Sequence, residues 1–146
     1  MTGRVEGIFI SAEEGELPLP VESVRAIAGK GLEGNRYFDR GTPESELTLI
    51  AAEALEALRA EHGIELDAAG SRRNVLTSGI DLNALVGKRF RVGDVECRGV
   101  ELCEPCSYLE SLTQPGIIKG LVHRGGLNAE ILTDGELRPG DAVVAL

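Results

Sequence analysis

Two cysteines, Cys103 and Cys106, stand three residues apart in the stretch ELCEPCSYLE, residues 101–110. Pro105 lies between them, fixes one backbone angle and ends any preceding strand. An amphipathic run over residues 108–112 follows at once, so we expect a strand end, a tight turn and a thiol in the first turn of a helix. A helix N-terminus lowers the pKa of a thiol, and the thiolate is the form that attacks or binds metal. Cys106 is therefore the first candidate for chemistry.

The cysteine pair fits several kinds of site. Structural zinc needs four ligands, and one Cys-x-x-Cys pair supplies two of them. The other soft ligands, Cys97, His62 and His123, form no second pair, so no zinc is expected. A thioredoxin-like redox pair belongs to a βαβ unit, whereas this pair lies late in a β-rich chain. Two readings stay open: Cys106 acting alone, with Cys103 as packing or as a resolving partner, and two inert buried cysteines.

Two carboxylates stand close to the pair in the sequence, Glu101 and Glu104. Nearby negative charge raises the pKa of a thiol, because it disfavours the thiolate. Free nucleophilic chemistry at Cys106 would therefore be hindered, whereas coordination to a metal would overcome the effect. The acidic neighbours favour a thiolate that is held by metal or sulfur.

Five arginines fall on expected loops beside glycine or asparagine, in a chain of net charge −9: Arg36, Arg40, Arg72, Arg73 and Arg124. Each alone is typical of a solvated surface. Together with a reactive cysteine they can form a pocket for an anion, because guanidinium groups fork onto phosphate and glycines leave room for it. Asn74 can donate and accept hydrogen bonds at a polar ligand. His123 is a candidate acid or base.

The composition limits the class of protein. With 146 residues, the chain is expected to form one domain, residues 1–146, with a buried core. Aromatic residues make up 3%, tryptophan is absent and the net charge is negative. A nucleic-acid partner is therefore not expected. No apolar run has the length of a membrane span or of a signal peptide, so a cytoplasmic protein without a membrane partner is expected.

The residue pattern predicts a mainly β (α+β) domain. Short strands are expected at residues 4–10, 21–28, 89–92, 95–102, 129–132 and 142–146. The clearest helix covers residues 51–62, with Gly63 as its C-terminal cap, and residues 79–87 form one helical turn. Other segments are expected to be irregular: residues 11–20, 29–41 and 67–70. Many short strands with few helices predict an antiparallel β-barrel with the helices on its outside.

Seven segments occur in the order found in one known family. They are GLEGNR (31–36), LTLI (47–50), RNVLT (73–77), GIDLNALVG (79–87), PC (105–106), RGG (124–126) and GDAV (140–143). Nearly the whole chain thus resembles a stand-alone MOSC domain, the domain at the C-terminus of molybdenum cofactor sulfurases. The resemblance implies a β-barrel with short peripheral helices, similar to the barrel domain of pyruvate kinase. The chain departs from the family pattern at Asn35, where an acid is usual, and at Arg72 and Arg73, where Gly-Glu is common.

The MOSC resemblance implies a molybdenum-cofactor-binding or sulfur-carrier protein. Cys106 matches the family cysteine, which is expected to carry sulfur as a persulfide or to ligate molybdenum. The catalytic residues implied are Cys106 and His123. The residues implied to bind molybdopterin, a small anionic pterin, are Arg36, Arg72, Arg73, Asn74, Arg124 and Gly125.

The same resemblance implies two activities, sulfur transfer to metal–sulfur centres and reduction of N-hydroxylated compounds. The full sulfurases also carry a pyridoxal-phosphate cysteine desulfurase domain, for which this chain has no room. A cysteine desulfurase or an electron-donor protein is therefore expected to act in trans. One alternative is a non-catalytic adaptor barrel that binds a partner protein, and another is a zinc or redox protein using the cysteine pair.

Overall fold

The computed structural model describes residues 2–13, 15–104, 109–110 and 113–146. Cys106 and the turn expected around Pro105 therefore lie outside the described residues, as does most of the helix predicted over residues 108–112. Among the described residues, no helix is long and apolar enough to cross a membrane.

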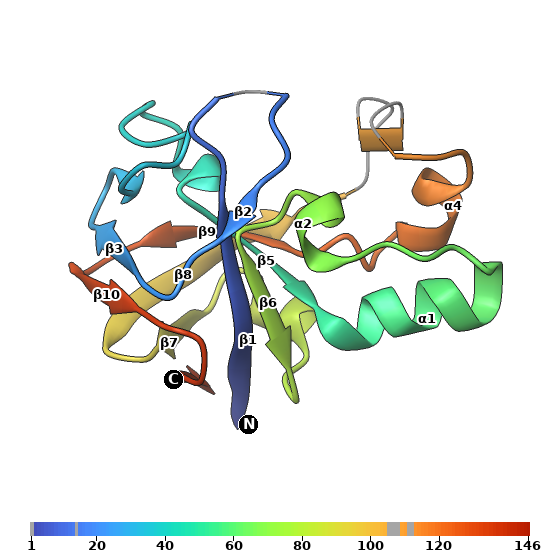
Figure 1. Cartoon of the computed structure of the whole chain (residues 1–146). Helices are drawn as coiled ribbons and strands as arrows, with labels where there is room; N and C mark the ends of the chain where they lie inside the picture. Colours follow the sequence, from blue (N-terminus) through green and yellow to red (C-terminus); the bar gives the residue numbers. More distant parts are fainter. Residues whose placement is uncertain (1, 14, 105–108, 111–112) are drawn as a thin grey trace.

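Seven strands close into a barrel in the order β1-β11-β7-β8-β9-β5-β6, with β6 returning to β1 (Figure 1). Their bounds are β1 Thr2–Ile10, β5 Leu47–Ala51, β6 Val75–Ser78, β7 Arg89–Val92, β8 Val95–Leu102, β9 Leu127–Ile131 and β11 Ala142–Ala145. The predicted mainly β barrel is confirmed. Closure pairs the outer strands β1 and β11, which leaves the barrel without a free edge in this part of the sheet.

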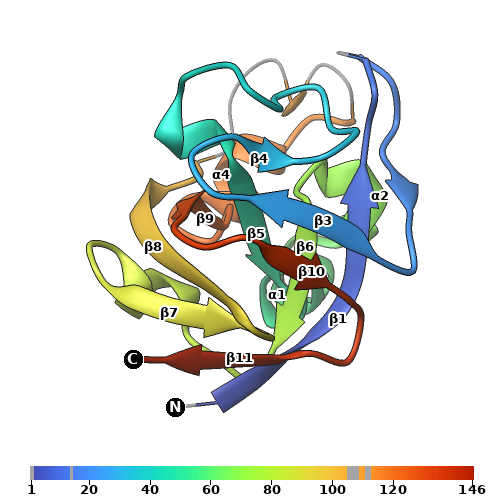
Figure 2. The ribbon, with the colours of Figure 1, turned by 90° about the vertical axis from the view of Figure 1, so that its left-hand side faces the viewer.

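A second sheet lies across one opening of the barrel, the one that faces the viewer in Figure 2. It contains β3 (Val24–Ile27), β4 (Gly31–Leu32) and β10 (Gly135–Leu137) in the order β10-β3-β4. Its buried side chains, among them Ala26, Leu32 and Leu137, belong to the same apolar cluster as the barrel interior. The small sheet therefore closes that end of the core. A two-residue strand, β2 (Leu19–Pro20), pairs with the end of β1.

The barrel contains one parallel pair, β5 with β6, and the strand pairing elsewhere in the ring is antiparallel. The prediction of an antiparallel barrel is thus corrected at this pair. Parallel neighbours need a long crossover, which here contains α1 (Ala52–His62) and α2 (Ala68–Ser71). Helix α1 ends as predicted at Gly63, which adopts φ 64°.

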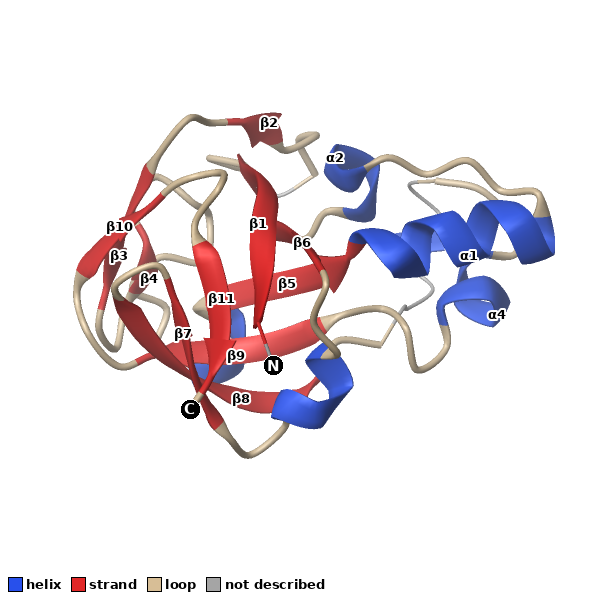
Figure 3. Ribbon diagram, turned by 90° about the horizontal axis from the view of Figure 1, so that it is seen from below, coloured by secondary structure: helices blue, strands red, loops and turns tan. Residues whose placement is uncertain are grey.

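The helices gather beside the barrel and form a second, smaller core. Figures 1 and 3 show α1 next to α4 (Ile117–Leu121), outside the ring of strands. The apolar side chains between them are Leu58, Ile64, Leu109, Ile117 and Leu121. The narrow apolar stripe of α1 therefore faces α4 as well as the sheet. A single helical turn, η2 (Leu82–Leu85), confirms the turn predicted between residues 79 and 87.

Several segments that the sequence predicted to be irregular form short elements. Residues 67–70 contain the N-cap and most of α2, because the Asp67 carboxylate accepts a 2.7 Å hydrogen bond from the Gly70 amide and caps the helix. The glycine-rich segment 29–41 contains β4, which pairs with β3. The segment 11–20 contains β2. Both strands have only two residues, which is too short for an alternating pattern of exposed and buried residues to reveal them.

One buried carboxyl group in the barrel, Glu46, gives a pH-dependent prediction. Burial is the main cause that raises its pKa above the ordinary value of 4.5, and a hydrogen bond from the Ile131 amide opposes the rise. The folded protein therefore holds this proton to a higher pH than the unfolded chain does. Stability is lost as pH rises from near 4.5 toward the raised pKa.

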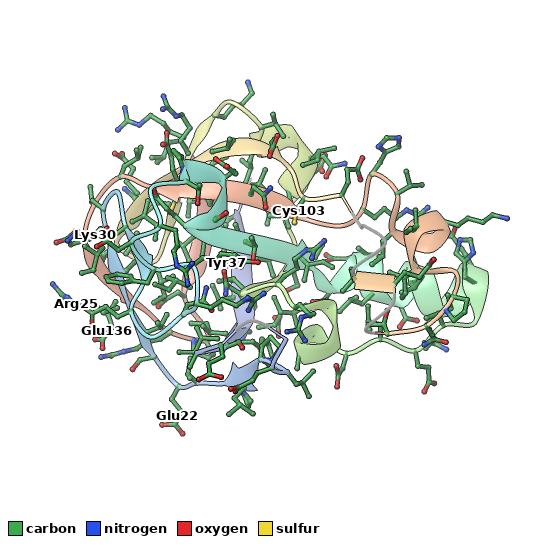
Figure 4. The ribbon with its side chains drawn as sticks, turned by 90° about the horizontal axis from the view of Figure 1, so that it is seen from above. Glu22, Arg25, Lys30, Tyr37, Cys103 and Glu136 are labelled. Carbon is green, nitrogen blue, oxygen red and sulfur yellow. The ribbon has the colours of Figure 1, made fainter. Side chains whose placement is uncertain are left out.

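Glu46→Gln removes this titration. The difference in unfolding free energy between the variant and the native protein should therefore shift in favour of the variant from about pH 4 to about pH 7. Urea denaturation at both pH values measures the change. Glu22→Gln is the control, because Glu22 lies on the surface (Figure 4). Identical pH dependence in the Glu46 variant and in the native protein would contradict the assignment.

Candidate functional site

Three arginines meet at one cavity, which we call the arginine cavity. Its volume is about 190 Å³, and its lining includes Arg36, Thr48, Arg72, Arg73, Asn74 and Cys103. Two of its residues, Tyr37 and Cys103, are labelled in Figure 4. Pockets for drug-sized ligands measure about 300–1,000 Å³. The arginine cavity therefore fits a small anionic group or one end of a larger ligand.

Arg36 enters this cavity from the loop after β4. Asn35 fixes that loop, because its Oδ1 accepts a 3.1 Å hydrogen bond from the Ser11 amide, and the Arg36 amide donates to the Ser11 carbonyl at 2.8 Å. The guanidinium carbon lies 4.6 Å from the centre of the Tyr37 ring. Its Nε is buried, and no hydrogen-bond partner is found for it within the described part of the chain. A buried donor without an acceptor is costly, so an anion here would stabilise it.

Asn74 lines the same cavity, but its amide group binds the protein itself. Its Oδ1 accepts hydrogen bonds from the backbone amide and the hydroxyl of Thr48, at 3.1 and 3.0 Å. Its Nδ2 donates to the Phe9 carbonyl at 3.2 Å. The side chain thus connects β5, β6 and β1 beneath the cavity. We assign Asn74 to shaping the cavity wall.

Arg73 also donates to backbone carbonyls. Its Nε donates to Gly125 at 2.8 Å, its Nη1 to Ser71 at 3.3 Å and its Nη2 to Cys103 at 3.2 Å. Arg72, its neighbour, caps α2 with φ 64° and donates from Nη2 to the Glu16 carbonyl. The two adjacent arginines therefore connect different loops around the cavity.

His123 is paired with Glu104. The two carboxylate oxygens of Glu104 lie 2.7 Å from the backbone nitrogen of His123 and 2.9 Å from its Nδ1. Both side chains are exposed, with exposed fractions of 74% for His123 and 41% for Glu104. The sequence showed Glu104 only as a charge near the cysteines. Its partnership with a histidine 19 residues away could not be read from local spacing.

Arg124 and His123 face a second cavity, the helix-side cavity, which lies next to α1 and has a volume of about 500 Å³. Its lining includes Glu53, Ala54, Asp81, Asn83, His123 and Arg124. Arg124 donates to both oxygens of Glu61, at 2.9 and 3.3 Å, and lowers the pKa of that carboxyl. Four of the five arginines singled out in the sequence are thus divided between two cavities, and Arg40 lines neither of them.

A family model for the MOSC domain matches residues 38–144. The chain belongs to the MOSC domain family. This family is linked to molybdenum cofactor binding. The match covers β5 to β10, most of β11 and the helix-side cavity, whereas Arg36 and Tyr37 of the arginine cavity precede it.

Solved structures show the same fold at low sequence identity. The YuaD protein of Bacillus subtilis superposes with a TM-score of 0.86 at 17% identity, over 98% of this chain and 94% of that one. YiiM of Geobacillus stearothermophilus gives 0.77 at 16% identity, over 99% and 75%. YiiM of Escherichia coli gives 0.72 at 16% identity, over 98% and 69%. No curated protein matches the chain.

The cysteines of this MOSC domain differ in environment. Cys97 is buried in β8, and burial raises the pKa of its thiol to about 12, so it is unsuited to thiolate chemistry. Cys103 is partly exposed at the arginine cavity, and its amide donates to the Gly126 carbonyl at 2.8 Å. Cys106 lies outside the described residues. Within those residues, no group of three or more His, Cys, Asp or Glu side chains is arranged to hold a metal ion.

Proposed function

We propose that this MOSC domain binds molybdenum cofactor at the arginine cavity, with Cys106 as molybdenum ligand or persulfide carrier. The observation that carries the proposal is the convergence of Arg36, Arg72 and Arg73 on one small cavity, although the chain has a net charge of −9. Cys103 lies in the same lining and starts the segment that leads to Cys106. An anion bound there would contact a cavity wall that contains Cys103, which stands three residues before Cys106 in the sequence.

The residues present fit the phosphate end of such a cofactor. Among the described residues, the cavity lining contains three arginines and a single carboxylate, Glu44. The buried Nε of Arg36 is a donor that needs an acceptor, and phosphate oxygens accept from arginine in a forked geometry. When bound, the cofactor would supply two-electron chemistry or receive sulfur. The contribution of this chain is to bind the anion and to hold the thiol near it.

The partners of the reaction follow from the same proposal. A persulfide on Cys106 needs a sulfur donor, for which we propose a cysteine desulfurase in trans. A reductase role needs an electron-donor protein and an N-hydroxylated substrate. These two roles share the arginine cavity and differ in what Cys106 carries.

The test is to purify the protein from a molybdenum-replete host and to measure molybdenum, pterin and intact mass. We expect pterin in the native protein, together with either molybdenum or added sulfur on one thiol. Cys106→Ala should lose the molybdenum or the added sulfur, and the pterin should be retained at the arginines. Absence of both pterin and added sulfur, even after loading with molybdenum cofactor, would overturn the proposal.

A further inference from the structure

The helix-side cavity is lined by three chain segments that are far apart in sequence. They are the first turns of α1 with the residue before it, a segment within residues 79–83 and the loop of residues 123–126. Its volume of about 500 Å³ lies within the range of about 300–1,000 Å³ that is usual for sites of small organic ligands. Binding of molybdenum cofactor at the arginine cavity leaves this larger cavity without an assigned ligand.

Hydrogen bonds and an ion pair hold the three walls of the helix-side cavity together. The Glu53 carboxylate on α1 accepts a 2.8 Å hydrogen bond from the Gly79 amide. Asn83 Nδ2 donates to the His123 carbonyl at 2.8 Å, and Arg124 returns to α1 through its ion pair. Each wall is thus connected to the next. The cavity is therefore formed before a ligand binds, which lowers the cost of ordering it on binding.

Much of the lining is apolar. Three alanines, Ala51, Ala54 and Ala57, follow one another at a spacing of three residues and so share a face at the start of α1. Their small side chains leave room beside the helix. Ile80 and Leu82 add larger apolar side chains, and both are buried. A lining of this kind favours a hydrocarbon or aromatic group that leaves water.

The charge in the lining is negative overall. Its carboxylates, Glu53 and Asp81, accept hydrogen bonds from the backbone amides of Gly79 and Asn83, at 2.8 and 3.1 Å. An amide is neutral, so these bonds leave the negative charge in place. The arginine and the histidine of the lining each contact a carboxylate from outside it. The helix-side cavity therefore favours a cation, whereas the arginine cavity favours an anion.

We propose that the helix-side cavity binds small organic cations, with a protonated amine facing Glu53 and Asp81 and an apolar body against the alanines of α1. The linings of the two cavities have no described residue in common. The site is thus independent of molybdenum cofactor. Its test uses the purified protein without cofactor, so its failure and the failure of cofactor binding are distinguishable.

The probe is benzylamine, which is protonated at neutral pH and carries an aromatic ring. Benzyl alcohol and benzoate are the matched neutral and anionic probes, because they keep the ring and change the charge. Binding is measured by the chemical shifts of backbone amides in the isotope-labelled protein. We expect benzylamine to give saturable shifts within residues 51–57, 79–83 and 123–126. Benzyl alcohol should bind more weakly, and benzoate should give no saturable shifts.

Two charge variants test the carboxylates. Glu53→Gln and Asp81→Asn should each weaken benzylamine binding by about two- to fivefold, because both side chains are exposed and water screens the attraction. Their amide oxygens can still accept the backbone hydrogen bonds. Glu22→Gln controls for overall charge, since Glu22 is exposed outside the lining, and it should bind like the native protein. Binding of benzyl alcohol should be unchanged in all three variants.

A cavity-filling variant tests the apolar wall. Ala54→Leu places a larger side chain in the cavity and should abolish binding of both benzylamine and benzyl alcohol. Ala60→Leu is the matched control, because Ala60 is exposed on the same helix outside the lining. It should bind both probes like the native protein.

Absence of saturable benzylamine binding would overturn the proposal, as would benzoate binding of equal affinity. The same holds if Glu53→Gln and Asp81→Asn bind benzylamine as tightly as Glu22→Gln does, or if the saturable shifts lie outside the lining. Native affinity in folded Ala54→Leu would also contradict it. If Ala54→Leu does not fold, the charge variants and the three probes decide the question.

Discussion

Gly126→Ala is expected to destabilise the protein by about 3 kcal/mol or more. Gly126 has φ +114°, and a Cβ built on it would lie 2.0 Å from the carbonyl oxygen of Leu49 in β5. That oxygen belongs to the barrel backbone and cannot move without disturbing the sheet. The variant should therefore shift the urea midpoint strongly, or fail to accumulate as folded protein.

Gly41→Ala separates backbone strain from this clash. Gly41 also has a positive φ, +72°, but nothing lies within 4 Å of a Cβ placed there. Its substitution should cost only about 1 kcal/mol, the cost of the left-handed conformation for a residue with a side chain. Equal losses in the two variants would show that the loop before β9 moves away from β5. Such movement would also disturb the hydrogen bond from the Cys103 amide to the Gly126 carbonyl.

The barrel could be predicted because the signals of its strands are local. Strand β7 alternates exposed and buried residues, with Phe90 and Val92 inside, and a Gly-Asp turn joins it to β8. Helix α1 is marked by its alanine-rich stripe and by Gly63 at its end. Each signal lies within a few residues of the element that it specifies. The order of family segments then identified the closed barrel.

Two larger features that the sequence did not reveal depend on contacts between distant residues. Nothing local in residues 47–51 or 75–78 distinguishes a parallel from an antiparallel partner, and the crossover through α1 decides it. Helix α4 has only five residues, Ile117–Leu121, and follows Gly116, so it lacks a helix-length pattern. Its packing against Leu58 stabilises it. Tertiary contacts therefore determine these elements.

The same distinction holds for the candidate site. The types of its residues could be predicted from the sequence, and their contacts could not. Loop arginines indicated an anion pocket, and the structure gathers Arg36, Arg72 and Arg73 at one cavity. The direction of a side chain depends on its neighbours, so Arg124 turns to Glu61 beside α1. Glu104 looked unfavourable for a thiol when only its charge was considered. In the structure, its carboxylate oxygens contact the backbone nitrogen and the ring of His123.

Arg36→Ala is expected to weaken molybdopterin binding by about 10- to 100-fold, because a hydrogen bond to a charged group contributes about 1.5–3 kcal/mol. The buried Nε of Arg36 and its stacking on Tyr37 make it the arginine best prepared for the anion. Titration of the purified apoprotein with molybdopterin measures the loss. Inorganic phosphate, as competitor, should weaken molybdopterin binding to the native protein more than to the variant.

Arg124→Ala removes the same charge from the surface pair with Glu61, so it controls for the overall field of the protein. If the two variants weaken binding equally, long-range charge and not a built site explains the affinity. Arg36→Lys sharpens the comparison, because lysine keeps the charge but lacks the planar fork and stacks less well on an aromatic ring. Binding by Arg36→Lys that matches Arg36→Ala would assign the effect to the fork. Binding that matches the native protein would assign it to charge alone, and the buried Nε would then have no part in recognising the anion.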